Sequence, residues 1–438
     1  MGYGTPDGIS NSLTRDLSTW PNMEVFGISC PTASSCAAVG GLNVSHGRQV
    51  AALRTMDHGT WGAAHAVLQA QRRSDSNFED VSCFSAGNCL AVGSGVSNSN
   101  NGALIVLEHD GVWGAPHVYA LPDLRSSQIS LQVLRSTACS LDGTCWALDG
   151  VVTKSGEMNS YALGESAGHW LVPVRLAANL PLARVQLATS ISCSSMSSCT
   201  VAGLNVAQGS HRRTYFTQSE RNRIWDAARL IPTVVTDGDK AVLGIGNFWY
   251  QRVLACTAPS SCLFGGRAAK PIVGVVDQEI SGKWIAQLSG VGTAGAHVNS
   301  EVRDVACASA QLCVVTGTSS TSSSDNQLFV QVQHRHSWGR PVYYSAGRSS
   351  VPLAVGCPRV STCYVLGESE ATANHYQAVF VSMSRSGWSK IHFLGLNTTV
   401  NYLPWMRMSC SPSACWVAGV QTVAPGKEVT VVFRLAQP

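Results

Sequence analysis

Residues 80–93 read DVSCFSAGNCLAVG, which predicts two short β-strands joined by a turn between two cysteines. The same pattern occurs eight times, and we number these repeats units 1 to 8. Their first cysteines recur every 50 to 63 residues, a period typical of propellers and solenoids. The pairs, which use all 16 cysteines, are Cys30 and Cys36, Cys83 and Cys89, Cys139 and Cys145, Cys193 and Cys199, Cys256 and Cys262, Cys307 and Cys313, Cys357 and Cys363, and Cys410 and Cys415.

After its second cysteine, each unit continues toward a third and a fourth strand. In unit 2, residues 103–108 form the expected third strand, 109–111 form a hairpin turn, and Trp113 opens the fourth strand. A tryptophan recurs at this turn in seven units, and a position repeated throughout a fold favours packing, with sugar stacking as the alternative. These residues are Trp61, Trp113, Trp170, Trp225, Trp284, Trp338 and Trp388.

Unit 8 lacks a fourth strand of its own, because the chain stops after the expected third strand at residues 429–435. Residues 10–17 precede the first unit and have the length of a strand. We expect them to pair with residues 429–435, which would close a ring without a free sheet edge.

The predicted fold is therefore all-β: an eight-bladed propeller with four-stranded antiparallel blades, one disulfide per blade, and an N-terminal strand that closes the last blade. We expect one domain over residues 1–438, with residues 1–20 as closing strand and linker. The blades are expected to begin near residues 25, 78, 134, 188, 251, 302, 352 and 405.

The residues around the cysteines repeat as well. A residue of medium size stands two places before each first cysteine, a small residue follows it, and glycine stands four places after the second cysteine in every unit except unit 3, which has Asp149. Small and medium side chains on alternate faces suit a crowded innermost strand between two blades.

Units of the form SC-x5-C-x-AVG, followed by a third strand and G-x-W, resemble the cysteine-paired propeller repeats of secreted actinobacterial proteins. Residues 81–113 carry this resemblance best, and all eight units share it. The resemblance implies the fold and an extracellular location. It implies no reaction, because the family has no established common activity.

Composition agrees with an extracellular β-protein, since charged residues make up 13% of the chain and glycine is abundant. An even number of paired cysteines indicates disulfides in an oxidising compartment, and eight sites spread around a ring cannot converge on one metal ion. We expect a secreted or cell-surface protein whose leader has been removed. The net charge of +4 without a basic run indicates no nucleic-acid partner, and no apolar run is long enough to span a membrane.

Candidate functional residues are those that depart from the repeat near the expected channel mouth. Paired carboxylates for glycoside hydrolysis could come from Glu79, Asp80, Asp149 and Asp304. Arginine beside exposed aromatic residues would suit an anionic or neutral glycan. The ligand-binding candidates are Trp249, Tyr250, Arg252, Arg135, Arg303, Trp405 and Arg407, and the alternative is that these charges pair with one another and plug the channel.

We expect no metal and no cofactor, and we interpret the single close histidine pair, His334 and His336, as a surface feature of an outer turn. The sequence favours a monomeric, secreted recognition module that binds an extracellular glycan or other polymer. A polysaccharide hydrolase or lyase and a scaffold for protein partners remain alternatives.

Overall fold

The computed structural model describes residues 14–44, 48–67, 75–97, 100–119, 121, 124–181, 183–194, 198–208, 213–235, 253–269, 272–293, 299–321, 326–372, 375–398, 406–424 and 427–435. Over these ranges the chain consists of β-strands and turns with one short 3₁₀ helix, η3 (Ser126–Gln128).

All sixteen cysteines are disulfide-bonded, and each predicted pairing within a unit is confirmed. The Cα atoms of each pair lie 4.0–4.1 Å apart, as expected for neighbouring strands of one hairpin. The bonds join Cys30 with Cys36, Cys83 with Cys89, Cys139 with Cys145, Cys193 with Cys199, Cys256 with Cys262, Cys307 with Cys313, Cys357 with Cys363, and Cys410 with Cys415.

Each unit begins with an innermost strand that carries the first cysteine or ends just before it. These strands are β2 (Met23–Ser29), β7 (Asn77–Ser85), β12 (Ile129–Cys139), β17 (Ala183–Ser194), β22 (Leu254–Ala258), β26 (Asn299–Ser309), β31 (Ser349–Arg359) and β36 (Arg407–Ser411). The second strands, which carry the second cysteine, are β3 (Cys36–Val44), β8 (Asn88–Ser97), β13 (Cys145–Thr153), β18 (Ser198–Ala207), β23 (Ser261–Ala269), β27 (Leu312–Ser320), β32 (Thr362–Thr372) and β37 (Ala414–Ala424).

The third strands are β4 (Arg48–Asp57), β9 (Asn100–His109), β14 (Met158–Ser166), β19 (Arg213–Arg221), β24 (Ile272–Ile280), β28 (Asn326–His334), β33 (His375–Ser384) and β38 (Lys427–Leu435). The outer strand is one piece in units 5 and 8, as β25 (Lys283–Val291) and β1 (Thr14–Trp20). Elsewhere it is split into β5 (Thr60–Trp61) and β6 (His65–Ala66), β10 (Val112–Trp113) and β11 (His117–Tyr119), β15 (His169–Trp170) and β16 (Val174–Arg175), β20 (Ile224–Trp225) and β21 (Arg229–Val235), β29 (Ser337–Trp338) and β30 (Val342–Tyr344), and β34 (Gly387–Trp388) and β35 (His392–Thr398).

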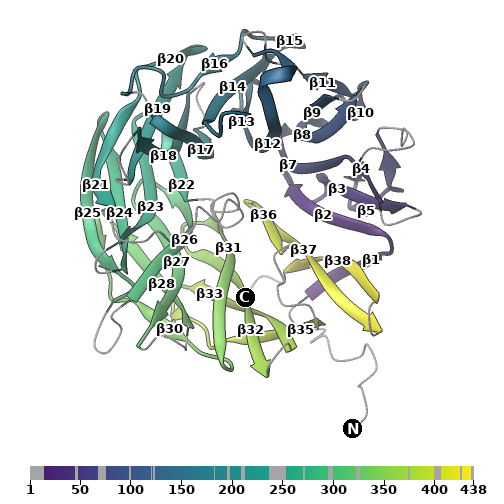
Figure 1. Ribbon diagram of the computed structural model, residues 1–438. Helices are drawn as coiled ribbons and strands as arrows, with labels where there is room; N and C mark the ends of the chain where they lie inside the picture. The colour runs from purple at the N-terminus through teal and green to yellow at the C-terminus, as the bar shows by residue number, and fades with distance from the viewer. Residues whose placement is uncertain are drawn as a thin grey trace.

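The units are arranged around a ring, with the innermost strands toward its centre (Figure 1). Each innermost strand contacts that of the next unit, from β2 through to β36, and β36 contacts β2. Hydrogen bonds group the described strands into seven sheets, because units 3 and 4 are joined by a single parallel bridge between Met158 and Val185. This arrangement is that of a β-propeller.

The apolar cores lie between units rather than inside them. Leu53 of unit 1, for example, packs in one cluster with Val81 and Leu104 of unit 2. All seven turn tryptophans are partly buried against such clusters, which agrees with their interpretation as packing residues. Each unit therefore depends on its neighbours to bury its apolar faces.

The two ends of the described chain meet in one sheet. β1 pairs antiparallel with β38, with Thr14 opposite Leu435 and Trp20 opposite Thr430. From the sequence this strand is expected at residues 10–17, of which 10–13 lie outside the described residues, and the observed strand continues to Trp20. It extends further because Trp20 is buried and packs edge-on against Trp61, with ring centroids 4.9 Å apart.

The innermost strands use one edge to pair with the second strand, so the N–H groups on their other edge need different acceptors. At four interfaces between units, the serine before the first cysteine supplies such an acceptor. The hydroxyl oxygens of Ser29, Ser82, Ser192 and Ser409 accept hydrogen bonds of 2.9–3.0 Å from the backbone N–H of Cys83, Cys139, Cys256 and Cys30, respectively. The serine of the repeated Ser-Cys dipeptide thus links its unit to the next.

Gly356 takes the place of this serine between units 7 and 8. A Cβ atom on Gly356 would lie 2.6 Å from Sγ of Cys410 and 3.1 Å from Cε of Met408. The side chains of Cys410 and Met408 fill the space that a side chain at this position would occupy. This interface also carries the disulfide with the shorter loop, between Cys410 and Cys415.

We predict that Ser82→Ala lowers the free energy of unfolding by about 1 kcal/mol, because the N–H of Cys139 loses its acceptor. Urea denaturation followed by circular dichroism measures this change. Ser34→Ala, at an exposed position, is the matched control and should leave stability unchanged. Equal effects of the two substitutions would contradict a linking role for the serine.

Four consecutive units bury a glutamate at the same place. Each lies opposite the turn tryptophan of its unit: Glu108 opposite Trp113, Glu165 opposite Trp170, Glu220 opposite Trp225 and Glu279 opposite Trp284. All four are at most 4% exposed. Burial raises the pKa of each above its ordinary value, and for Glu108 to about 7 despite the nearby Thr55 hydroxyl, which opposes the shift.

We predict that the protein is more stable at pH 5 than at pH 8. In the folded protein Glu108 keeps its proton up to about pH 7, whereas in the unfolded chain it loses the proton near its ordinary pKa. Protonation of Glu108 therefore favours the folded state at low pH, and this contribution to the free energy of unfolding disappears as the pH rises through about 7. Glu108→Gln should therefore raise the melting temperature at pH 8, on the order of 2 °C, with little effect at pH 5. Glu157→Gln, at an exposed position, is the control. An equal rise in the melting temperature of Glu108→Gln at pH 5 and at pH 8 would contradict the prediction.

Candidate functional site

A β-bulge recurs four residues before the first cysteine and determines which side chains reach the centre of the ring. In six units the register between the first and second strands shifts at this residue, which the cross-strand pairing skips. A bulge bends its strand and redirects the side chain. The bulged residues are Phe26, Glu79, Arg135, Thr189, Arg303 and Leu353.

The bulge also explains several of the repeated glycines. A Cβ atom on Gly40, Gly93 or Gly317 would lie about 2 Å from a backbone carbonyl oxygen of the first strand. In these three units the close approach of the first strand leaves no room for a side chain at that position.

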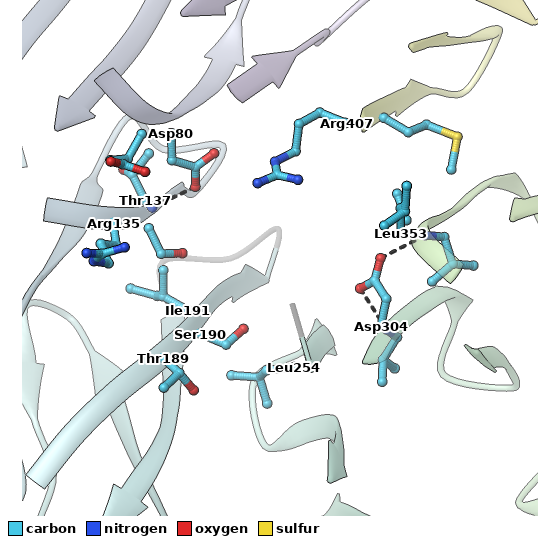
Figure 2. Close-up of a pocket in the computed structure, with 16 residues that line it drawn as sticks. Asp80, Arg135, Thr137, Thr189, Ser190, Ile191, Leu254, Asp304, Leu353 and Arg407 are labelled. Atoms are coloured by element: carbon cyan, nitrogen blue, oxygen red, sulfur yellow. Dashed lines mark hydrogen bonds between the residues drawn. The ribbon is translucent and has the colours of Figure 1, made fainter. Parts of the chain in front are cut away.

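A hollow of about 250 Å³ lies at the centre of the ring, among the innermost strands of units 2 to 8 (Figure 2). Its lining comes from three neighbouring positions, four, three and two residues before the first cysteine. The lining residues are Glu79, Asp80, Arg135, Ser136, Thr137, Thr189, Ser190, Ile191, Leu254, Asp304, Val305, Leu353, Ala354, Val355, Arg407 and Met408.

Two of the predicted carboxylates occupy equivalent places in this lining. Asp80 and Asp304 both stand three residues before the first cysteine and are buried. Oδ2 of Asp80 accepts a hydrogen bond from Thr137 N of the next unit (3.1 Å), and Oδ2 of Asp304 accepts one from Val355 N of the next unit (2.7 Å). Oδ1 of Asp304 also accepts from Val305 N (2.8 Å). Both carboxylates thus join adjacent innermost strands at the edge of the hollow.

Arg407 occupies the same position in unit 8. Its Nε donates to Phe26 O (2.9 Å) and its Nη1 to Met406 O (3.2 Å), so two backbone carbonyls fix the guanidinium group. In Figure 2 this group extends into the hollow toward the side that carries Asp80, whereas Asp304 lies across the hollow. The centre of the ring therefore presents fixed charges of both signs.

The other predicted charged residues are more scattered. Glu79 lines the hollow and accepts a hydrogen bond from Asn77 Nδ2 at 3.0 Å. Arg135 also lines it, from the bulge of unit 3. Arg303 lies outside the described lining and forms an ion pair with Glu301, with 3.6 Å between Nη2 and Oε2.

Asp149 lies apart from the hollow. It is fully buried in β13, and its Oδ2 accepts a hydrogen bond from Gln132 Nε2 at 2.7 Å. Burial raises the pKa of Asp149 to about 7, because the charged form loses its hydration and the Gln132 bond compensates only partly. The structure does not bring this residue together with Asp80 and Asp304.

The predicted aromatic residues, Trp249, Tyr250 and Trp405, lie outside the described residues, as does Arg252. Four hydroxyl residues that line one side of the hollow were not among the predicted site residues, namely Ser136, Thr137, Thr189 and Ser190. The sequence could have identified them, because they stand two, three or four residues before the first cysteine of their units, as the other lining residues do.

Histidines do not contribute to the described lining of the hollow. His334 is exposed at the end of β28. His336 lies in the turn that follows β28, with its Nδ1 3.4 Å from Oε1 of Gln278. Within the described ranges, no group of three or more histidine, cysteine, aspartate or glutamate side chains is placed to hold a metal ion. None of the helices in that part of the chain has the length and apolar character needed to cross a bilayer.

No protein-family model matches the sequence, and no curated protein matches it either. Among solved structures, the chain is similar to the WD40 domain of SCAP from fission yeast, with 9% identity, a TM-score of 0.48 and coverage of 98% of this chain and 96% of that one. It is also similar to an ulvan lyase of a new polysaccharide lyase family, with 10% identity, a TM-score of 0.45 and coverage of 96% of this chain and 94% of that one. A third similar structure is the WD40 propeller domain of Doa1, with 9% identity, a TM-score of 0.44 and coverage of 98% of both chains. Likeness at this level carries no conclusion about a ligand or a reaction.

We predict that Asp304→Ala destabilises the fold by about 1–3 kcal/mol, because the N–H groups of Val305 and Val355 both lose their acceptor. Asp57→Ala, at a side chain that is 81% exposed, is the control and should have a much smaller effect. Chemical denaturation measures both. An unchanged unfolding midpoint for Asp304→Ala would show that this carboxylate does not hold the strands together.

Proposed function

We propose that this protein is a secreted, monomeric recognition module, an eight-bladed propeller that binds an extracellular glycan at the central hollow. The observation that carries the proposal is the hollow itself, where guanidinium, carboxylate and hydroxyl groups converge on one space of about 250 Å³. Small-molecule sites typically combine apolar walls with a few well-placed polar groups, and Ile191, Leu254 and Leu353 supply such walls.

Eight blades would follow from the eight disulfide-bonded units, the pairing of β1 with β38, and the contact between β36 and β2. In this proposal the single domain extends over residues 1–438. Secretion is supported by the disulfides, which persist in oxidising compartments and are rare elsewhere.

Binding without turnover is favoured over hydrolysis by the hydrogen bonds of the carboxylates. Asp80 and Asp304, the two that occupy equivalent positions, accept hydrogen bonds from backbone N–H groups of the next unit. Glycoside hydrolysis needs two carboxyl groups on either side of the scissile bond, one of them protonated. In this protein the two equivalent carboxylates instead hold adjacent innermost strands together, which is a structural role for the oxygens that this chemistry would need.

The test is a glycan array probed with the full chain, followed by calorimetric titration of the best ligands and assays for new reducing ends or unsaturated products. We expect saturable binding without product. Product formation that Asp80→Asn and Asp304→Asn both abolish would replace the proposal with a hydrolase or lyase. Absence of glycan binding together with capture of a protein ligand would indicate a scaffold.

We predict that Arg407→Gln weakens glycan binding by about tenfold, because a charge-assisted hydrogen-bond donor is removed from the hollow. Arg385→Gln, on the exposed turn between β33 and β34, is the control. Thermal melting must accompany the titration, since Arg407 also bonds to Phe26 O. Unchanged affinity in a variant that melts normally would show that ligands bind elsewhere.

A further inference from the structure

A smaller crevice lies beside the central hollow, where units 4, 5 and 6 meet. Its volume is about 20 Å³, and its walls include the aromatic rings of Tyr215 and Phe264, whose centroids are 4.9 Å apart. Thr189, which is labelled in Figure 2, lines both the crevice and the hollow, so the two spaces are adjacent. The crevice has room for about one water molecule, so a sugar ring stays outside it and only a small substituent can enter.

Two arginines at this crevice share one carboxylate. Arg267 and Glu301 border the crevice, and Arg303 stands two residues after Glu301 on β26. Nη1 of Arg267 lies 3.8 Å from Oε1 of Glu301, and Nη2 of Arg303 lies 3.6 Å from Oε2. Both distances are longer than hydrogen bonds between charged groups, which measure about 2.7–2.9 Å. Neither ion pair therefore occupies the N–H donors of its guanidinium group.

The guanidinium groups are also more accessible than the carboxylate that they share. The side chains of Arg267 and Arg303 are 38% and 37% exposed, whereas that of Glu301 is 20% exposed. An arginine presents its donors as a planar fork, which matches the oxygens of a carboxylate or a sulfate group. The apolar walls next to Arg267 lower the local polarity, and this strengthens the attraction between its charge and an anion.

We infer that Arg267 and Arg303 bind an anionic substituent, a carboxylate or a sulfate, on the sugar unit next to the one in the central hollow. Arg267 makes the closer contact, because it borders the crevice that adjoins the hollow. This inference rests on the proposed function and narrows it from glycans in general to acidic glycans.

The test compares three β-1,4-linked hexasaccharides by calorimetric titration at low ionic strength: glucose, glucuronate and 6-sulfated glucose. They share one backbone and differ in the anionic substituent. We expect both acidic hexamers to bind about tenfold more tightly than the glucose hexamer, because each can form the short, charge-assisted hydrogen bonds that Glu301 does not form with the arginines. The order of the two acidic hexamers identifies the substituent.

A matched pair of variants separates this site from general attraction. Arg267→Gln should reduce the preference for the acidic hexamers to about twofold or less. Arg385→Gln removes the same charge at the exposed turn between β33 and β34 and should leave the preference intact. The comparison is needed because a protein with a net charge of +4 attracts polyanions over its whole surface.

Glu301→Gln tests the inference in the opposite direction. It should increase the preference for the acidic hexamers, because a competing carboxylate is removed while both arginines remain. Loss of a residue that only supports the strands would not change the preference in this direction. Melting curves must accompany the titrations, since Glu301 also interacts with other groups.

The titrations distinguish failure of this inference from failure of the proposed function. Equal binding of the acidic and glucose hexamers would overturn the inference and leave glycan recognition in place. The same conclusion would follow if the preference survived Arg267→Gln, fell equally in Arg385→Gln, or was lost in Glu301→Gln, each in a folded protein. No binding of any hexamer, together with no binding on the glycan array, would overturn the proposed function as well.

Discussion

The free edges of the innermost strands impose the constraint on which this structure depends. Each of these strands pairs with its second strand on one side only, so the remaining N–H groups point across the interface to the adjacent unit and must find acceptors there. The hydroxyl oxygen of Ser82 accepts a hydrogen bond from the N–H of Cys139. Two residues earlier on each strand, the carboxylate of Asp80 accepts one from the N–H of Thr137. The ring is held at its centre by side chains one and three residues before the cysteine.

The disulfides act within single hairpins, whereas these hydrogen bonds join neighbouring units. Each joins two cysteines only five or six positions apart, and in units 2, 3 and 4, for example, the two cysteines are directly paired across the hairpin. Such short loops restrict the unfolded chain only modestly, so the bridges mainly fix local register. Assembly of the units depends instead on apolar clusters shared by neighbours and on the strand pair β1–β38, where Trp20, Trp61 and Trp416 pack together.

The groups that line the hollow have two roles because of where the bulge lies. The bulged strand places the residues two, three and four positions before the cysteine around the centre, which is also where the units meet. A charge at this position, such as Asp304 or Arg407, is fixed by backbone groups on adjacent strands and at the same time faces the hollow. Fixed polar groups of this kind bind ligands with a small entropic cost, and their mutation affects stability and binding together.

The sequence by itself determined the repeat, the disulfide pairing, the turn tryptophans and the meeting of the two chain ends, because each is written in local spacing or in a pattern that recurs eight times. It also identified Glu79, Asp80, Arg135, Asp304 and Arg407 as residues near the centre. Tertiary structure alone decided that Asp149 is buried away from them, that Arg303 pairs with Glu301, and that Gly356 accommodates the disulfide of the next unit. The reason is physical: these outcomes depend on the distance between side chains of different strands and units, and spacing within one unit does not specify that distance.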